Sequence, residues 1–278
     1  MKTVLLISSF LSASQVGATA SAFCLRRLGL DVVILPTTLF GRHPGWGAPG
    51  GHAVPAATLS DMWTAISAQN IEFDGIMTGY MAAEDHIDLA VDIIKAVRKV
   101  NPASLVLVDP VKGDDGRLYI PERRAKALAK RLVPKANILT PNLYELEVLA
   151  GRSLTRLTDI ISAARDIGSD VLVTSVPKDD QIGAPQIGAL WVNAQSAAYV
   201  GHDSFKTVPN GGGDSLAALF LARRLQGMPP RAAQQQAVSS IFDILSAARH
   251  GRYSELPLTQ YQAKLSQPKL LDIQDILS

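Results

Sequence analysis

The sequence predicts a three-layer α/β/α sandwich with a mainly parallel central sheet. Short apolar runs alternate with segments of helical spacing, which is the pattern of βαβ units. These runs are almost continuous in Val, Ile and Leu, which indicates that helices cover both faces of the sheet. The chain has 278 residues, 47% of them hydrophobic, and we find no linker, repeat or low-complexity segment. We therefore expect one domain over residues 1–278.

Boundary signals separate the elements in the first half of the chain. The expected order is strand 3–9, helix 16–28, strand 31–35, helix 58–69, strand 75–77, helix 83–100 and strand 104–108. Gly29 follows the first helix, and Thr58 is a candidate N-cap for the second. Asn101-Pro102 ends the third, because proline cannot continue a helix.

The second half continues this alternation and then departs from it. The expected order is helix 121–132, strand 137–139, helices 143–150 and 154–167, strands 171–175, 187–192 and 197–200, and helices 214–225 and 230–248. Pro121 suits the first turn of its helix, where its missing N–H breaks no intrahelical bond. The consecutive strands 187–192 and 197–200 predict an antiparallel hairpin or meander beside the parallel strands.

One segment near the N-terminus carries no periodic pattern. Residues 40–51 contain five glycines and two prolines in twelve positions. A loop of this size is typical of functional flaps, so we expect a flap at about residues 38–52. Trp46 within it is too large and apolar to be exposed without a role. The alternative is an ordinary surface loop that Trp46 pins to the body.

Composition and charge exclude several classes of protein. Lys and Arg number 27 against 25 Asp and Glu, so no basic excess predicts nucleic acid or a membrane as a partner. The single cysteine, Cys24, excludes an intramolecular disulfide and fits a reducing compartment. Residues 1–22 resemble a signal peptide in part, but Ser8, Ser9 and Gln15 interrupt the apolar run. This favours a buried first strand and a cytoplasmic location.

Polar side chains follow the carboxyl ends of the expected parallel strands. They are Ser8 and Ser9, Thr78 and Tyr80, Asp109, Thr140 and Asn142, and Thr174. Open α/β sheets bind ligands beyond this edge, so we expect a binding site there.

The stretch Gly211-Gly-Gly-Asp214 precedes the expected helix 214–225. Glycines let the free N–H groups of a helix N-terminus close around a phosphate. An acid at this point is a poor phosphate ligand, but it can take a proton from a hydroxyl that attacks the phosphoryl group. The pattern therefore predicts phosphoryl transfer with Asp214 as the base. In the alternative, Asp214 only caps the helix and the glycines form a turn.

Phosphoryl transfer from a nucleotide also needs a divalent cation. The candidate residues around it are Asp109, Asn142 and Glu145. Asn142 and Glu145 are three residues apart at a helix start, so both can face one ligand. In the alternative, Asn142 is the N-cap and Glu145 completes a capping box. Because Asp109 and the glycine triplet accompany them, we favour the functional interpretation.

Several of these motifs resemble a known family. Gly211-Gly-Gly-Asp214 before a helix of small residues resembles the anion-hole signature of the ribokinase superfamily. Thr140–Glu145 and Asp109–Asp114 resemble its vitamin kinase branch. Within this branch, the segments that resemble the pyridoxal kinases are Ile7–Ser9, Val16-Gly17, Arg26–Gly29, His43–Gly47 and Thr78–Tyr80. The matches run in order from the first strand to the glycine triplet and cover most of the chain.

The resemblance implies a ribokinase-like fold and ATP-dependent phosphorylation of the 5′-hydroxymethyl group of pyridoxal, and often of pyridoxine and pyridoxamine. It also implies Mg²⁺, a monovalent cation such as K⁺, and a homodimer. Asp214 would be the catalytic base, with the anion hole formed by Gly211, Gly212 and Gly213. The residues implied on the nucleotide side are Asp109, Thr140, Asn142, Glu145, Thr174, Gly211 and Gly213, with Asp109 and Glu145 serving the metal. Those implied around the substrate are Ser9, Val16, His43, Trp46, Tyr80 and Asp214.

The sequence departs from the family pattern at four positions. Pro44 follows the flap histidine where many pyridoxal kinases have Thr, and Ala18 stands where Asn is usual. Phe10 replaces a frequent His or Arg, and Thr174 stands where Lys is often found. These differences leave the preferred vitamer open.

Two alternative functions share this core. A hydroxymethylpyrimidine kinase acts on a similar flat heterocycle with a hydroxymethyl arm, but the flap and Thr78-Gly-Tyr80 favour pyridoxal. A non-catalytic protein that binds pyridoxal or its phosphate could use the same fold. The intact Asp214 and glycine triplet favour an enzyme.

Overall fold

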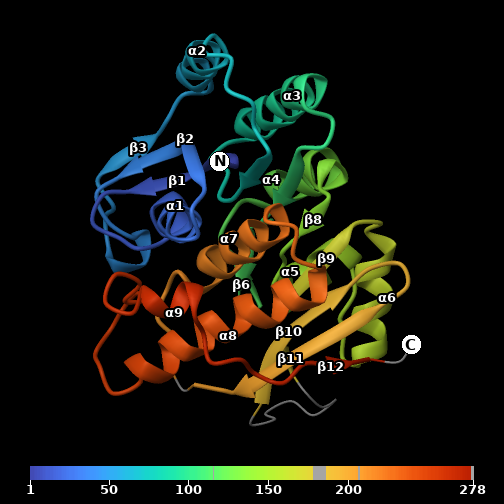
Figure 1. Ribbon diagram of the computed structural model, residues 1–278. Coiled ribbons are helices and arrows are strands. Elements are labelled where there is room, and N and C mark those ends of the chain that lie inside the picture. Colours follow the sequence, from blue (N-terminus) through green and yellow to red (C-terminus); the bar gives the residue numbers. More distant parts are fainter. Residues whose placement is uncertain (115, 178–185, 206, 277–278) are drawn as a thin grey trace.

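A computed structural model describes residues 1–114, 116–177, 186–205 and 207–276. Its main sheet has ten strands in the order β12-β11-β10-β9-β8-β5-β4-β1-β2-β3 (Figure 1). The bounds of these strands are β1 Thr3–Leu11, β2 Asp31–Phe40, β3 Gly51–Ala53, β4 Gly75–Thr78, β5 Leu105–Val108, β8 Ile138–Leu139, β9 Asp170–Pro177, β10 Gln186–Val192, β11 Ala197–Asp203 and β12 Gln274–Asp275. A separate small hairpin is formed by β6 Gly113–Asp114 and β7 Arg117–Leu118.

Helices connect most of the strands. Their bounds are α1 Gly17–Arg27, α2 Ala56–Ser67, α3 Glu84–Val100, α4 Glu122–Ala127, α5 Leu143–Ala150, α6 Leu157–Asp166, α7 Gly212–Leu225, α8 Pro230–Ala248 and α9 Ala263–Ser266. Within the described ranges, no helix is both long enough and apolar enough to span a bilayer.

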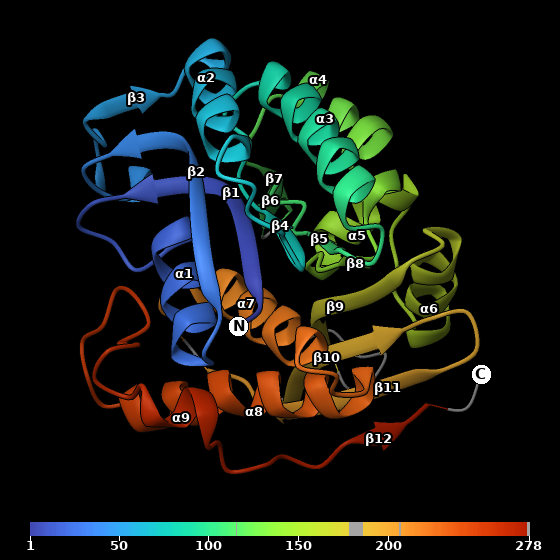
Figure 2. The same cartoon turned by 45° about the horizontal axis from the view of Figure 1, so that its top comes forward.

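The pairing confirms a mixed sheet that is mainly parallel. From β2 to β9 in sheet order, every neighbouring pair of strands is parallel. Antiparallel strands extend both edges: β3 pairs with β2, and β10, β11 and β12 follow β9 (Figure 2). The carboxyl ends of the parallel strands therefore lie along one edge, as the sequence predicts.

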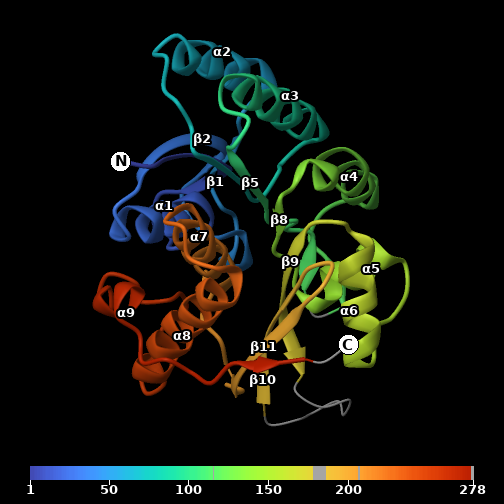
Figure 3. The same cartoon turned by 45° about the vertical axis from the view of Figure 1, so that its right-hand side comes forward.

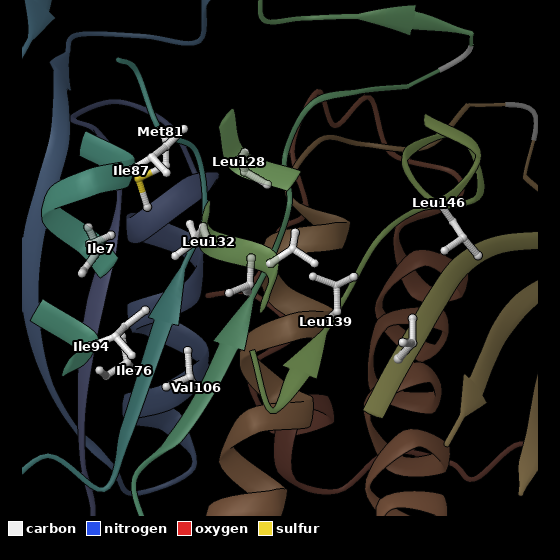
Figure 4. Close-up of a cluster of buried hydrophobic side chains, with 14 of the residues drawn as sticks. Ile7, Ile76, Met81, Ile87, Ile94, Val106, Leu128, Leu132, Leu139 and Leu146 are labelled. Carbon is white, nitrogen blue, oxygen red and sulfur yellow. The ribbon is translucent and has the colours of Figure 1, made fainter. Parts of the chain in front are cut away.

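Helices cover both faces of the sheet, so the molecule has three layers, with the sheet in the middle. Helices α1, α7 and α8 lie on one face, and α3 to α6 lie on the other (Figure 3). The strand β1 serves both cores, because Leu5 and Ile7 face one layer while Val4 and Leu6 face the other. On the α3 side, Ile87 and other buried aliphatic side chains pack over the strands (Figure 4).

Three helices differ from the sequence expectation, and one of them, expected at 154–167, is confined to Leu157–Asp166. The second helix begins at Ala56 after Pro55, so Thr58 lies inside it and is not the N-cap. The helix expected at 121–132 is α-helical only to Ala127 and continues as a π-helical turn over Leu128–Leu132. Pro134 gives a physical reason for this change, because it has no N–H to donate to a carbonyl one turn earlier.

The expected flap is a strand-flanked turn. Strand β2 extends to Phe40, and Gly51–Ala53 pairs with it as β3, so only residues 41–50 form the turn. A short 3₁₀ turn, Pro44–Trp46, lies at its tip, and the His43 side chain accepts a hydrogen bond from Gly45 N–H at 3.1 Å. This framework holds the segment at the edge of the sheet, beside the carboxyl end of β1.

Candidate active site

Buried hydroxyl groups gather at the carboxyl ends of the parallel strands. Ser8 lies in the second half of β1, Thr78 ends β4 and Thr140 follows β8, and all three are almost completely buried. The hydroxyl oxygens of Ser8 and Thr78 have no hydrogen-bond partner in the part of the chain that the structure describes, whereas the Thr140 hydroxyl lies close enough to Asp109 to lower the pKa of that carboxyl. Buried polar atoms usually find partners, so this edge has the character of a ligand site.

Asp214 lies in the first turn of α7 and touches the start of α1. Its Oδ2 accepts a hydrogen bond from Gly17 N–H at 2.9 Å. The partial burial of the carboxyl raises its pKa, while the Gly17 N–H and the charge of His43 offset part of this rise. The residue brings together three segments that are distant in sequence: the β1–α1 turn, the flap and α7.

The glycine triplet forms the N-terminus of α7 as predicted. Gly211 adopts a left-handed φ of 92°, and α7 has no side-chain cap. A Cβ at Gly211 would overlap the Gln15 carbonyl oxygen, whereas Gly212 and Gly213 face open space. The first-turn N–H groups of α7 can therefore receive an anion, because a helix N-terminus carries partial positive charge.

Asp109 follows β5 and lies within electrostatic reach of two other acids. Burial raises its pKa well above the ordinary value, and the charges of Glu145 and Asp214 raise it further. Three carboxyl groups thus share one region with little water around them. A cation would relieve their repulsion. The described residues contain no group of three or more His, Cys, Asp or Glu side chains that could hold a metal by themselves.

Glu145 has the structural role that the sequence left as an alternative. It forms a capping box with Asn142: Glu145 N–H donates to Asn142 Oδ1 at 2.8 Å, and Asn142 N–H donates to Glu145 Oε2 at 3.0 Å. Its Oε1 accepts from Lys112 N–H at 2.7 Å. Burial raises the Glu145 pKa, and these backbone N–H groups offset part of the rise. A metal role would therefore add to the capping role.

The remaining nucleotide-side candidates lie on adjacent backbone. Thr174 in β9 bridges to Asn142, and its N–H donates to Pro141 O at 2.9 Å. The next residue, Ser175, has a left-handed φ of 59°, which is uncommon for a residue with a side chain. The Asn142 side-chain amide donates to Gly113 O at 2.8 Å, so it ties α5 to the β6–β7 hairpin.

The substrate-side candidates lie around Asp214 to differing degrees. Ser9 is buried against Gly17, and Val16 is the buried residue that precedes α1, beside Gly211. The charge of His43 on the flap lowers the pKa of Asp214. The Trp46 ring lies tilted against the His43 ring, with centroids 5.4 Å apart, and stays 39% exposed. The structure thus brings His43 toward the base and leaves Trp46 partly exposed.

A cavity of about 360 Å³ lies next to the glycine triplet. Its lining includes Phe205, Pro209, Arg249 and Tyr253, and it lies between the segment before Gly211 and the end of α8. A second cavity, of about 380 Å³, lies at the amino ends of β8 and β9, on the opposite edge of the sheet. Of these two cavities, the first is the one whose lining comes close in sequence to the glycine triplet, because it includes Pro209.

The relatives of the chain are named kinases. The family model described as Phosphomethylpyrimidine kinase matches residues 45–255. A protein named pyridoxal kinase PdxY from Corynebacterium diphtheriae is 31% identical over 274 residues, covering 96% of each chain. Another of that name, from Rubrobacter xylanophilus, is 30% identical and covers 95% of this chain and 94% of its own. The chain belongs to the pyridoxal kinase family.

Solved pyridoxal kinases have the same fold. The enzyme of Leishmania donovani in complex with ADP and pyridoxamine superposes with a TM-score of 0.92 at 23% identity, covering 100% of both chains. The enzyme of Entamoeba histolytica superposes with a TM-score of 0.90 at 22% identity, covering 99% of this chain and 100% of its own. These likenesses confirm the ribokinase-like fold.

Sequence reasoning missed two features of this candidate site. It noted Val16-Gly17 but did not anticipate that the Gly17 N–H would bind the Asp214 carboxylate. It also gave no separate role to Lys112 in Asp-Pro-Val-Lys-Gly-Asp, although this side chain is fully buried. A lysine directly after an apolar strand and Pro110-Val111 was the only available signal for the second feature.

The buried Lys112 ammonium predicts a measurable loss of stability. Burial lowers its pKa from 10.5 to about 8, and the charge of Glu145 offsets part of this effect. At pH 7 the folded protein must hold a charge that the unfolded chain leaves in water. Lys112→Met keeps the volume and removes the charge, so we expect the free energy of unfolding at pH 7 to rise by on the order of 2–3 kcal/mol.

Urea unfolding at several pH values tests this expectation. Between pH 8 and 10.5 the Lys112 amine binds more protons in the unfolded chain than in the folded one. The free energy of unfolding of the wild type therefore rises with pH in this window. The advantage of Lys112→Met should therefore shrink above pH 8. The exposed Lys130→Met is the matched control and should change little at any pH. A Lys112→Met variant that is less stable than wild type at pH 7 would contradict the argument.

Proposed function

We propose that this chain transfers the terminal phosphoryl group of ATP to the 5′-hydroxymethyl group of pyridoxal. The observation that carries the proposal is the placement of Asp214. Its carboxylate contacts the α1 N-terminus, lies at the uncapped glycine N-terminus of α7, and shares an electrostatic environment with Asp109. Membership of the pyridoxal kinase family supports the substrate.

In the proposed reaction, Asp214 takes the proton of the substrate hydroxyl as its oxygen attacks the γ-phosphorus. The bond from that phosphorus to the β,γ-bridging oxygen breaks, and ADP leaves. The raised pKa of Asp214 suits this step, because a base accepts a proton more readily as its pKa approaches the working pH. The N–H groups of Gly211, Gly212 and Gly213 bind the negative charge of the group in transfer.

The flap contributes by closing the site over the substrate. The charge of His43 lowers the pKa of Asp214, so the flap turn lies near the proposed base and would cover a substrate bound there. Exclusion of water protects the phosphoryl group from hydrolysis and strengthens the electrostatic interactions inside. Ser9 would hydrogen-bond the polar edge of the pyridine ring, and Tyr80 would stack on its face.

On the nucleotide side, the proposal assigns Asp109 and Glu145 to Mg²⁺, mainly through water. When bound, the ion offsets the charge of the phosphates and of the acids around them. Thr140, Asn142 and Thr174 would line the phosphates, and the cavity at Phe205 and Tyr253 would hold adenine. A K⁺ requirement, a homodimer and a cytoplasmic location are further expectations from the family.

Turnover with purified protein tests the proposal. With ATP and Mg²⁺, we expect pyridoxal to be converted to a phosphate ester faster than hydroxymethylpyrimidine. The match to the phosphomethylpyrimidine kinase model makes the second substrate a necessary comparison. Preference for hydroxymethylpyrimidine would replace the proposal with that activity. Tight binding of pyridoxal without any ester would identify a binding protein. Removal of Mg²⁺ by a chelator should stop the reaction.

A further inference from the structure

A line of buried hydrogen bonds crosses the base of the flap. The Thr37 hydroxyl in β2 donates to Tyr80 O at 2.7 Å. The Thr37 carbonyl accepts from Val54 N–H at 3.0 Å, directly after β3. The Val54 carbonyl in turn lies 2.8 Å from His86 Nε2 in the first turn of α3. Four segments are thereby joined: the turn after β4, both strands of the flap, and α3.

The bonds in this line have defined donors because the groups are buried. Thr37 is 0% exposed, and His86 is 2% exposed. A carbonyl oxygen can only accept, so His86 carries its proton on Nε2. Burial lowers the His86 pKa, which favours this neutral form. The line therefore has one direction, from a donor on α3 through the flap strands to Tyr80.

The neighbouring Thr38 shows that burial alone does not produce such a bond. Thr38 is also 0% exposed, yet its hydroxyl has no partner among the described residues. The two threonines are adjacent in β2, but the pairing with β1 shifts between them: Ser8 pairs with Pro36 and Ser9 with Thr38, so Thr37 is the extra residue of a bulge. A bulge changes the direction of the side chain it carries. Only the Thr37 hydroxyl reaches the backbone that carries Tyr80.

The backbone at Tyr80 is fixed from two sides. Gly79 N–H donates to Ile7 O at 3.0 Å, and a Cβ at Gly79 would approach Ser8 Oγ to 2.5 Å. This packing presses the turn against β1. The Thr37 hydroxyl holds the following carbonyl from the side of β2. Loss of that hydroxyl would leave a carbonyl without its partner and release one side of the turn.

We propose that Thr37 is a positioning residue that sets the Tyr80 ring relative to the flap. The inference rests on the proposed function, in which Tyr80 stacks on the substrate ring. The Thr37 side chain links the turn that carries Tyr80 to the flap strand β2. The Tyr80 ring on one side of the substrate and the flap on the other therefore keep a fixed separation. Thr37 therefore contributes to substrate affinity without touching the substrate, and it has no link to the nucleotide side.

The test compares three variants. Thr37→Val removes the hydroxyl and keeps the shape, Thr37→Ser restores a hydroxyl, and Thr38→Val makes the same change at the neighbour without a partner. For Thr37→Val we expect the KM for pyridoxal to rise about tenfold, with the KM for ATP within about twofold of wild type. Thr37→Ser should recover most of the affinity, and Thr38→Val should match wild type.

Calorimetric titration with pyridoxal and with ADP gives a readout besides turnover. The Kd for pyridoxal should rise in Thr37→Val while the Kd for ADP stays unchanged. Equal losses for both ligands, or the same loss in Thr38→Val, would overturn the inference in favour of general destabilisation. If Thr37→Val fails to fold, Thr37→Ala and Thr37→Ser give the same comparison. If wild type binds pyridoxal but forms no ester, the proposed function fails while the Kd comparison still tests Thr37.

Discussion

Asp214→Asn lowers turnover with pyridoxal and Mg-ATP by roughly two to four orders of magnitude, with substrate binding largely kept. The amide has nearly the shape of the carboxylate, so its oxygen can still accept the Gly17 N–H. It cannot take a proton from the attacking hydroxyl. Steady-state kinetics and titration with pyridoxal separate the two effects, because kcat should fall while Kd changes little.

The exposed Asp166→Asn on α6 is the control for this experiment, because it makes the same chemical change away from the site. Its turnover should equal that of wild type. Near-normal turnover of Asp214→Asn would remove the proposed base, and the contact with the Gly17 N–H would then be the main role of this residue. A loss of fold, detected by circular dichroism, would be expected in neither variant.

Gly211→Ala is the second change with a large expected effect. Its φ of 92° disfavours any side chain, and the new Cβ would overlap the Gln15 carbonyl oxygen. Relief requires the glycine N–H groups to move away from the α1 N-terminus, where Gly17 contacts Asp214. We expect turnover to fall by about a hundredfold, because removal of a single stabilising donor has effects of this order. Single-turnover kinetics would report the loss in the chemical step.

Gly29→Ala isolates the backbone strain from the overlap. Gly29 also has a left-handed φ, of 80°, but a Cβ there meets nothing within 4 Å. The variant should lose stability by about 1 kcal/mol and keep its turnover. Equal losses of turnover in Gly29→Ala and Gly211→Ala would mean that strain anywhere lowers activity, and would remove the specific role of the triplet.

Periodicity predicted most of the fold because the buried strands and amphipathic helices repeat a local pattern. The helix 230–248 and the helix 143–150 have the predicted bounds. The strand β3 could not be predicted in this way, since Gly51, His52 and Ala53 have weak strand preference and become a strand by pairing with β2. The β6–β7 hairpin was not predicted for the same reason, because its residues become strands only by pairing with each other.

The site was predictable where a residue follows a strand and less so where contact depends on distant segments. Asp109 and Thr140 lie at strand ends as expected. The Gly17–Asp214 bond joins residues 197 positions apart, and no spacing in the sequence reports such a contact. The Thr37–Tyr80 bond is similar, because it depends on the register of β2 beside β1. Motif resemblance identified the residues, while their partners required the structure.

The capping box at Glu145 has a consequence for experiments on metal dependence. Its two carboxylate oxygens fasten the start of α5 and the backbone at Lys112. Truncation to alanine would loosen both attachments, so a weaker response to added Mg²⁺ would mix folding with ligation. Glu145→Gln keeps the length of the side chain and one acceptor oxygen. It is therefore the more informative replacement for a titration with Mg²⁺.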